Sequence, residues 1–452
     1  MFFFTGPRPS LNQIMNKLAF VERIKAVIDR TYHVYSVVKT IDTWSPEKVK
    51  SYIDESFYNI VNYCYQHVPY YHRLFNDYSL DPKQFTSIGY ISKIPVLTKE
   101  IIRNNYEKLR SDELHIIKYQ DRRSGGTTGE PIRSLVSREA AAFETFSYFK
   151  GLAWMGWKPD MTFVKIFGGS LGLGIKANLR QRMYLLSTNA ISIPAFELNS
   201  DTISNYYDVL KGKKGICLIG YASAINILVE LLKSKGLTLK NIILVITTSE
   251  QLIDDWRDNI KSYFNCEVRS YYGCGEIGSL GYQIYNGDQS YRIPKEHVHI
   301  ENDNLTNELY ITQLHNKAQP LLRYANGDLG SISTHNPWSI ENFYGRTADL
   351  FIRKDKVKVS PNFGAHAILH SRIPVLQYQY IQYSNNVIEF RYIMESGELK
   401  SEHKTILQNI IDYVMGEHTE VHFVQNQSFE TSKSGKHRIT VTVNRPFDKP
   451  KP

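Results

Sequence analysis

The chain has 452 residues, 42% of them hydrophobic, which is enough for a sizeable core and more than one domain usually contains. Its formal net charge is +9, which suits anionic ligands such as nucleotides, but its Lys and Arg residues are scattered, so a mildly basic solvated surface is favoured over a nucleic-acid site. The four cysteines have no metal-site spacing, and no stretch reaches the roughly 18 apolar residues of a spanning helix. These properties predict a cytoplasmic protein and argue against a transmembrane segment, a zinc site or a nucleic-acid partner.

The first part of the chain is predicted to be mainly helical. Apolar residues recur every three or four positions over 12–30, and the segment 45–68 begins with Ser, Pro and Glu, which is typical of a helix start. Another helix is expected over 98–109, with Thr98 as its N-cap.

From residue 115 onward, strands and helices are expected to alternate. A strand over 115–120 leads into a glycine-rich segment, and a helix over 137–156 follows. The next expected strands are 161–169, 215–221, 242–250 and 268–273, and the helices between them are 201–212, 223–236 and 251–264. Because this alternation favours a parallel sheet, we expect an α/β fold with ligands bound at the carboxyl ends of the strands.

Short strands follow after residue 290, and the chain after about residue 347 has the pattern of a small α+β unit. The segments of that unit are 365–370, 375–383, 385–393 and 421–425, with a helix over 402–415 and a last strand over 437–443. We therefore predict two domains. The large domain, 1–346, would contain mostly parallel sheets flanked by helices plus a β subdomain, and 347–452 would form a small mobile α+β domain.

The segment SGGTTGEP, residues 124–131, is the densest chemical signal. Its glycines allow backbone amides to approach an anion closely, and its Ser and Thr hydroxyls add donors for phosphate oxygens. No Lys follows the last glycine, so this is not the loop of P-loop NTPases. On this segment alone, a flexible hairpin turn is the alternative to a phosphate loop.

SGGTTGEP resembles the phosphate-loop signature of the adenylate-forming (AMP-forming) ligases, in the branch of phenylacetate–CoA ligases and CapK-type capsular polysaccharide proteins. Four further segments resemble elements of that family and occur in its order. They are YYGCGEIG at 271–278, RYANGDLG at 323–330, GRTADL at 345–350 and SKSGKHR at 432–438. The resemblance implies an enzyme that activates a carboxylic acid with ATP and Mg2+. It would release pyrophosphate, form an acyl-adenylate, and pass the acyl group to a thiol such as CoA or to an amine, releasing AMP.

The resemblance also implies roles for single residues in nucleotide binding. The β- and γ-phosphates of ATP would be held by Ser124, Gly125, Gly126, Thr127, Thr128 and Gly129. Glu276 would bind Mg2+, and Asp328 would accept hydrogen bonds from the ribose hydroxyls. Ser249, Glu250, Tyr272 and Gly273 would border the adenine, with Tyr272 stacked on the base. The alternatives are an exposed loop position for Glu276, a turn position for Asp328 and ordinary core packing for Tyr272.

Further roles concern catalysis and the acyl group. Lys436, in the small domain, would be the mobile catalytic cation that meets the substrate carboxylate and the α-phosphate. Arg346 would reach the ribose or a phosphate beside the interdomain hinge. The acyl pocket would be lined by Phe167, Gly168 and Tyr221.

The chain departs from the family pattern at several positions. Glu130 stands where many relatives have Lys, and Cys274 with Gly275 replaces the commoner neighbour before the Glu. Ala348 occupies the place of a carboxylate hinge residue. Three functions therefore stay open: a ligase acting on CoA or an amine, a ligase of surface polysaccharide assembly with a sugar-linked acid or acceptor, and a nucleotide-binding scaffold with a decayed site.

Overall fold

The computed structural model describes most of the chain, and its described residues divide between two compact units. Described are 31–123, 132–167, 189–249, 252, 254–284, 288–345, 351–355, 358–359, 373, 375–384, 386–394, 397–425, 440–443 and 446–447. The first unit comprises Met1–Arg123, Arg133–Met161 and Arg269–Gly345, and the second comprises Ser124–Ile132, Thr162–Val268 and Arg346–Pro452. Movement of 347–452 as a separate domain stays a prediction.

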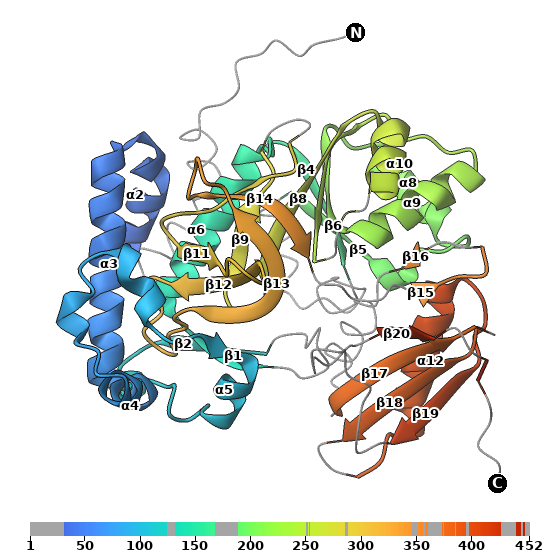
Figure 1. The fold of residues 1–452 in the computed structure, drawn as a ribbon. Coiled ribbons are helices and arrows are strands. Elements are labelled where there is room, and N and C mark those ends of the chain that lie inside the picture. Colours follow the sequence, from blue (N-terminus) through green and yellow to red (C-terminus); the bar gives the residue numbers. More distant parts are fainter. Residues whose placement is uncertain are drawn as a thin grey trace. The chain divides into compact units, whose positions relative to one another are not determined.

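Figure 1 shows the helices of the first unit, and local capping chemistry determines where several of them begin. In α3 (Pro46–His67), Ser45 accepts a hydrogen bond from the backbone N of Lys48, and a proline occupies the first turn. Thr98 caps α5 (Lys99–Asn104) and Ser137 caps α6 (Arg138–Trp154) in the same way. The predicted starts of these helices are confirmed, but α5 ends five residues before the predicted end at 109. The remaining helices of this part are α2 (Tyr32–Thr40), η1 (Ile41–Thr43), α4 (Pro69–Asp77), η2 (Pro82–Gln84), η3 (Ile88–Lys93) and η4 (Asp112–His115).

The strand predicted over 115–120 lies four residues later than expected. The observed strand is β2 (Tyr119–Arg123), and residues 112–115 form the turn η4 instead. Ser111 explains this, because its hydroxyl accepts from the backbone N of Glu113 and caps that turn. β2 pairs antiparallel with β3 (Arg133–Ser137), so that Arg123 lies opposite Arg133.

The sheet of the first unit is antiparallel, apart from one short strand. Its order is β11-β12-β13-β14-β10-β9-β8, and β1 (Leu97–Thr98) runs parallel to β13. The strands are β8 (Glu267–Cys274), β9 (Gly278–Tyr282), β10 (Tyr291–Arg292), β11 (Val298–Asn302), β12 (Glu308–Gln313), β13 (Tyr324–Ile332) and β14 (Ser339–Gly345). Strands β10 to β14 fall in the predicted β subdomain, whereas the strand predicted over 268–273 as part of a parallel sheet is β8, which pairs antiparallel with β9. Hairpins such as β11-β12, whose loop is short, impose antiparallel pairing.

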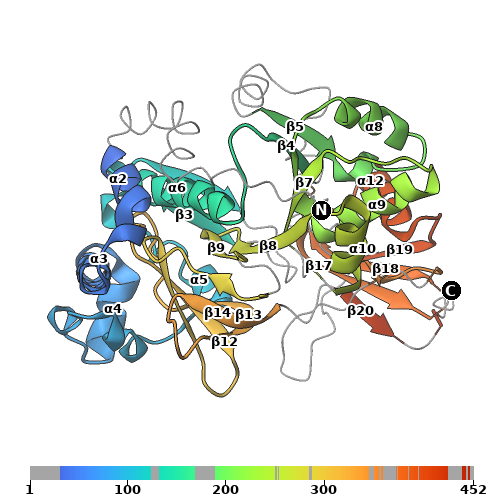
Figure 2. The same ribbon diagram turned by 90° about the horizontal axis from the view of Figure 1, so that it is seen from above.

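The second unit contains the predicted parallel sheet, with the order β7-β6-β4-β5, in which β5 is a strand that was not predicted. Figure 2 shows β4, β5 and β7 of this sheet. Its strands are β4 (Thr162–Phe167), β5 (Ala190–Pro194), β6 (Ile216–Tyr221) and β7 (Ile242–Thr248). Helix α9 packs on β4, β6 and β7, and α10 packs on α9. The helices among the described residues of this part are η5 (Ala195–Glu197), α8 (Ile203–Lys211), α9 (Ala222–Ser234) and α10 (Asp254–Phe264). The α/β class is thus confirmed here.

The last part of the second unit is the predicted α+β segment. The order of its sheet is β19-β18-β17-β20, and α12 (Ser401–Met415) packs on that sheet. The helix ends at Gly416, whose φ of 75° is left-handed. The strands are β15 (Phe351–Ile352), β16 (Lys358–Val359), β17 (Val375–Tyr383), β18 (Ile388–Met394), β19 (Val421–Gln425) and β20 (Thr440–Val443). Tyr413 donates a hydrogen bond from this helix to the carbonyl of Ala195 in η5.

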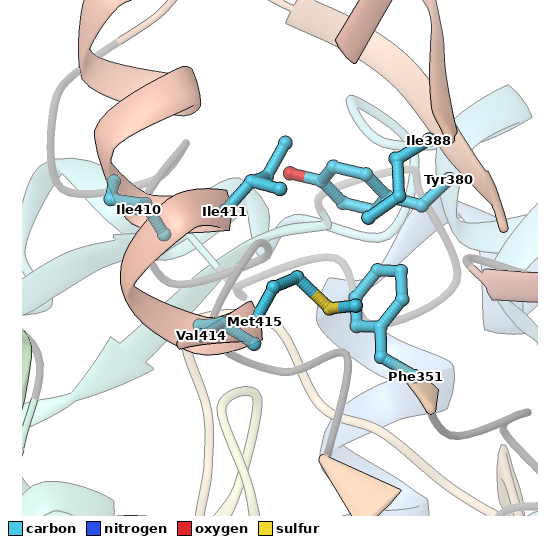
Figure 3. Close-up of a pocket in the computed structure, with 7 residues that line it drawn as sticks. All are labelled: Phe351, Tyr380, Ile388, Ile410, Ile411, Val414 and Met415. Atoms are coloured by element: carbon cyan, nitrogen blue, oxygen red, sulfur yellow. The ribbon is translucent and has the colours of Figure 1, made fainter. Parts of the chain in front are cut away.

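A small apolar pocket lies between α12 and its sheet, as Figure 3 shows. It is lined by Phe351, Tyr380, Ile388, Ile410, Ile411, Val414 and Met415. Its volume of about 10 Å³ is at the lower limit for one water molecule, so it has no room for a nucleotide or an acyl group. Within the described ranges, no helix combines the length and the apolar character that crossing a membrane requires.

Candidate functional site

The structure describes seven of the seventeen predicted site residues. The phosphate-loop residues Ser124 to Gly129, together with Gly168, Glu250, Arg346 and Lys436, lie outside the described residues. So do Glu130 and Ala348, two of the positions at which the sequence departs from the family pattern. The residues that can be placed are Tyr272, Gly273, Glu276 and Asp328 in the first unit, and Phe167, Tyr221 and Ser249 in the second.

In the first unit, Tyr272 and Asp328 are brought together by a third residue, Asn326. The Tyr272 hydroxyl donates to Asp328 Oδ2 over 2.9 Å. The Asn326 amide nitrogen donates to the Tyr272 hydroxyl over 2.7 Å and to Asp328 Oδ2 over 2.6 Å. All three side chains are buried, with Tyr272 6% exposed, Asn326 0% and Asp328 5%. We call these three residues the Tyr–Asn–Asp cluster.

Electrostatics holds the Tyr272 phenol in its donor form. Burial raises the pKa of this phenol well above its usual range, and the negative charge of Asp328 adds to the effect. The phenol therefore stays protonated and can donate to the carboxylate while it accepts from Asn326. The other side of the contact is apolar, because the Tyr272 ring packs against Phe343 with 4.4 Å between ring centroids. The core-packing alternative thus holds for Tyr272, and stacking on adenine stays a prediction.

Glu276 follows β8 in the turn that leads to β9, and it is buried rather than exposed. Its side chain is 5% exposed, and the hydroxyl of Tyr324, at the start of β13, lies 3.2 Å from its Oε1. The exposed-loop alternative is therefore wrong. Among the residues that the structure describes, no three His, Cys, Asp or Glu side chains gather into a metal site.

Two glycines shape the turn that carries Glu276. A Cβ atom at Gly273 would lie 2.7 Å from the carbonyl oxygen of Gly278, so only glycine fits the close approach of β8 and β9. Gly278 has a φ of 95°, and a Cβ there would lie 2.5 Å from the carboxyl group of Glu144. Glu144 in turn accepts from Arg122 Nη1 over 2.5 Å, and both side chains are about three-quarters buried.

Arg122 and Asn326 are site features that the sequence reasoning missed. Arg122 stands two positions before the predicted phosphate loop, and its Glu144 partner contacts the turn after Glu276. Asn326 lies inside the quoted segment RYANGDLG. The signal for Asn326 was available, because an amide two residues before an acceptor-only carboxylate can donate to it when both point to one face of a strand.

In the second unit, two predicted acyl-pocket residues are in contact. Phe167 and Tyr221 end the paired strands β4 and β6, and their rings meet edge to face with 5.3 Å between centroids. Lys165 shares a strand face with Phe167, and burial lowers the pKa of its ammonium group to about 8. Ser249, directly after β7, has a φ of 67°, which is uncommon for a residue with a side chain.

The comparisons with known proteins point to one group. No family model matches the chain. Protein CapK of Staphylococcus aureus is 23% identical over 409 residues, a match that covers 86% of this chain and 88% of that protein. Phenylacetate-coenzyme A ligase of Thermus thermophilus is 23% identical over 312 residues, which covers 64% of this chain and 67% of that protein.

A solved structure supports the same grouping at the level of the fold. A 2-hydroxyisobutyryl-CoA ligase in complex with 2-HIB-AMP and CoA matches with a TM-score of 0.58. The match covers 88% of this chain and 91% of that chain, at 16% sequence identity. The chain therefore has the fold of that ligase.

Proposed function

Because the chain is a distant homologue of CapK and of phenylacetate-coenzyme A ligase, within the adenylate-forming ligase superfamily, we propose that it is an ATP-dependent, AMP-forming carboxylate ligase. The single observation that carries the proposal is the buried Tyr–Asn–Asp cluster. It joins the two sequence segments to which the resemblance assigns adenine and ribose recognition. Burying three polar side chains costs free energy unless their hydrogen bonds are made, so the satisfied cluster supports a retained nucleotide site, which the ligase and a nucleotide-binding scaffold would share.

The proposed first step forms an acyl-adenylate. A carboxylate oxygen of the acid attacks the α-phosphorus of ATP, the bond from that phosphorus to the bridging oxygen breaks, and pyrophosphate leaves with the electron pair. Negative charge shifts toward the phosphate oxygens, so positioning and electrostatic stabilisation dominate catalysis. Lys436 would supply mobile positive charge there, and the glycine-rich loop 124–129 would hold the terminal phosphates.

Among the described residues, Glu276 is a suitable ligand for Mg2+. Glu276 offers a buried carboxylate, a hard oxygen ligand of the kind Mg2+ takes, next to a hydroxyl donor that orients it. Mg2+ usually keeps several waters and binds one or two carboxylates together with substrate phosphates, so a lone protein carboxylate suffices. The ion would neutralise phosphate charge when bound.

In the proposed second step, an acceptor thiol or amine attacks the acyl carbon and AMP leaves. CoA is the acceptor that the name of the phenylacetate-coenzyme A ligase gives, whereas the name of CapK gives none. We propose a cytoplasmic enzyme that uses ATP and CoA or a sugar-linked amine, in the assembly of a capsule or another surface polysaccharide. A nucleotide-binding scaffold is the second candidate, favoured by Glu130 and Ala348.

A pyrophosphate-release assay tests the proposal. The purified chain is incubated with ATP, Mg2+ and pooled carboxylic acids, and release above the acid-free rate is expected for at least one pool. Adding CoA, then amino acids or amino sugars, to the active pool identifies the acceptor by accelerated AMP release. ATP binding without release from any pool would favour the scaffold, and absence of ATP binding would reject both candidates.

A further inference from the structure

Asn326 uses its whole amide group inside the Tyr–Asn–Asp cluster. Its nitrogen carries two hydrogens, and the two acceptors in reach are the Tyr272 hydroxyl at 2.7 Å and Asp328 Oδ2 at 2.6 Å. Its oxygen accepts from the backbone N of Asp328 over 3.1 Å. Rotating the amide by half a turn would point the oxygen at the carboxylate and the nitrogen at a backbone N–H. Only one orientation of the amide is therefore compatible with its surroundings.

The backbone at this point is built for that arrangement. Gly327, between the two residues, has a φ of 86° and nothing within 4 Å of the place where a Cβ would stand. The glycine is thus required for its left-handed conformation rather than for space. The strand pairing with β12 and β14 is also irregular across this stretch, with register shifts between Glu308 and Tyr310 and between Leu329 and Gly330. Regular backbone hydrogen bonds to the neighbouring strands therefore do not by themselves determine the position of the Asp328 carboxylate.

Strand pairing does not connect Tyr272 to Asp328 either. Tyr272 lies on β8 and Asp328 on β13, and these strands are separated by β14, β10 and β9 in the sheet order. The Tyr272 hydroxyl bonds Asp328 directly, and the Asn326 amide adds a bridge by donating to both of them. Both partners are buried, where a hydrogen bond is stronger than in water and an unmade one is expensive.

We propose that Asn326 is a positioning residue that holds Tyr272 and Asp328 as one unit, so that recognition of the nucleotide's base and of its ribose is coupled. The inference rests on the proposed function for the identity of the ligand. Substitution by Ala would leave Tyr272 to donate to Asp328 but would remove the two donors that fix their relative position. Substitution by Asp would place a second carboxylate against the first.

The test uses the full chain and measures the dissociation constants of ATP and of 2′-deoxy-ATP. The variants are Asn326→Ala, Asp328→Asn and their combination, and Asn342→Ala is the matched control. Asn342 lies exposed on neighbouring β14, and its amide donates to the Ser331 hydroxyl over 3.0 Å. The Asn342→Ala variant therefore also removes an amide donor, but one outside the cluster.

We expect wild type to prefer ATP over 2′-deoxy-ATP at least about tenfold, the lower end of the range for one hydrogen bond to a charged group. Asn326→Ala should reduce this preference below about threefold and weaken ATP binding about tenfold. It should have little further effect in the Asp328→Asn background, because the residue acts through Asp328. Asn342→Ala should leave both constants unchanged. A folded Asn326→Ala variant with wild-type ATP affinity and preference would overturn the proposal.

Failure of the proposed function gives a different result. If wild type binds no ATP, the nucleotide assignment fails, and the positioning role is then judged from unfolding free energies alone. A double-mutant cycle between Asn326→Ala and Tyr272→Phe should show non-additive destabilisation if the cluster acts as one unit. Additive effects in that cycle would reject the positioning role as well.

Discussion

Lys150 Nζ lies 2.7 Å from Glu296 Oε2, and both side chains are completely buried in the first unit. The Ser147 hydroxyl donates to the other carboxylate oxygen over 2.6 Å. The ammonium group also lies 4.8 Å from the centre of the Trp154 ring. A buried ion pair contributes little net stability compared with an apolar pair of the same shape, but removing one partner leaves an uncompensated charge in a low-dielectric interior.

Replacing Lys150 by Met should therefore lower the free energy of unfolding by about 3–5 kcal/mol, measured by urea denaturation. The matched control is Lys211→Met on the surface pair with Asp208, whose side chains are 54% and 62% exposed. That variant should cost less than about 1 kcal/mol. A loss below about 1 kcal/mol for Lys150→Met would contradict the buried-charge argument.

Acidification should destabilise the chain through His299. Burial lowers the pKa of this imidazole to about 4, below the ordinary value of 6.5. Between these two pH values the unfolded chain binds a proton at His299 more readily than the folded chain does. The free energy of unfolding is therefore unaffected by His299 above about pH 6.5 and decreases as the pH falls toward 4. From pH 7 to pH 5 this group alone should reduce the free energy of unfolding by about 2 kcal/mol.

The measurement is urea unfolding at several pH values between 4 and 7. His299→Gln should flatten the dependence of stability on pH by that amount, because Gln does not titrate. The exposed His335→Gln, in the same unit, is the control and should retain the wild-type slope. An unchanged slope in the His299→Gln variant would show that other groups cause the acid sensitivity.

The contact between β4 and β6 makes Gly220 irreplaceable. A Cβ atom there would lie 2.2 Å from the carbonyl oxygen of Ile166, the residue paired with it on β4. Because that obstacle is strand backbone, Gly220→Ala should destabilise the chain by at least about 2 kcal/mol. Gly212, which ends α8 with nothing within 4 Å of its Cβ position, is the matched control. Gly212→Ala should be within about 1 kcal/mol of wild type, and equal thermal stability of the two variants would refute the close approach.

Local chemistry made part of the fold predictable from the sequence. The helix starts after Ser45, Thr98 and Ser137 are confirmed, since an N-cap depends on residues within one turn. Three of the parallel strands between 162 and 248, namely β4, β6 and β7, were also predicted, because apolar strands alternate there with amphipathic helices, whereas β5 was not. The antiparallel sheet of the first unit was not, since its pairing depends on contacts between distant segments.

Site residues, too, were predictable where the signal is local in the sequence and were missed where it depends on contacts between distant segments. Tyr272, Glu276 and Asp328 were proposed as site residues because each lies in a short segment that resembles an element of the ligases, and their roles stay predictions. Asn326 was overlooked, because its importance depends on Tyr272, which is 54 positions away in the sequence. The phosphate loop and Lys436 stay predictions, since both lie outside the described residues.

The assignment of Lys436 gives the most direct test of catalysis. If its ammonium group stabilises charge at the α-phosphate only while the acyl-adenylate forms, Lys436→Ala should slow pyrophosphate release at least about a hundredfold and change the dissociation constant of ATP less than about threefold. Lys433→Ala removes a like charge three residues earlier and is the matched control, expected to keep both values. Equal losses of ATP affinity and of rate in Lys436→Ala would indicate a ground-state binding role instead. If both variants slow pyrophosphate release to the same modest extent, the two lysines act only through the net charge of their segment. A catalytic cation must affect the rate more than a neighbouring charge that only attracts the nucleotide.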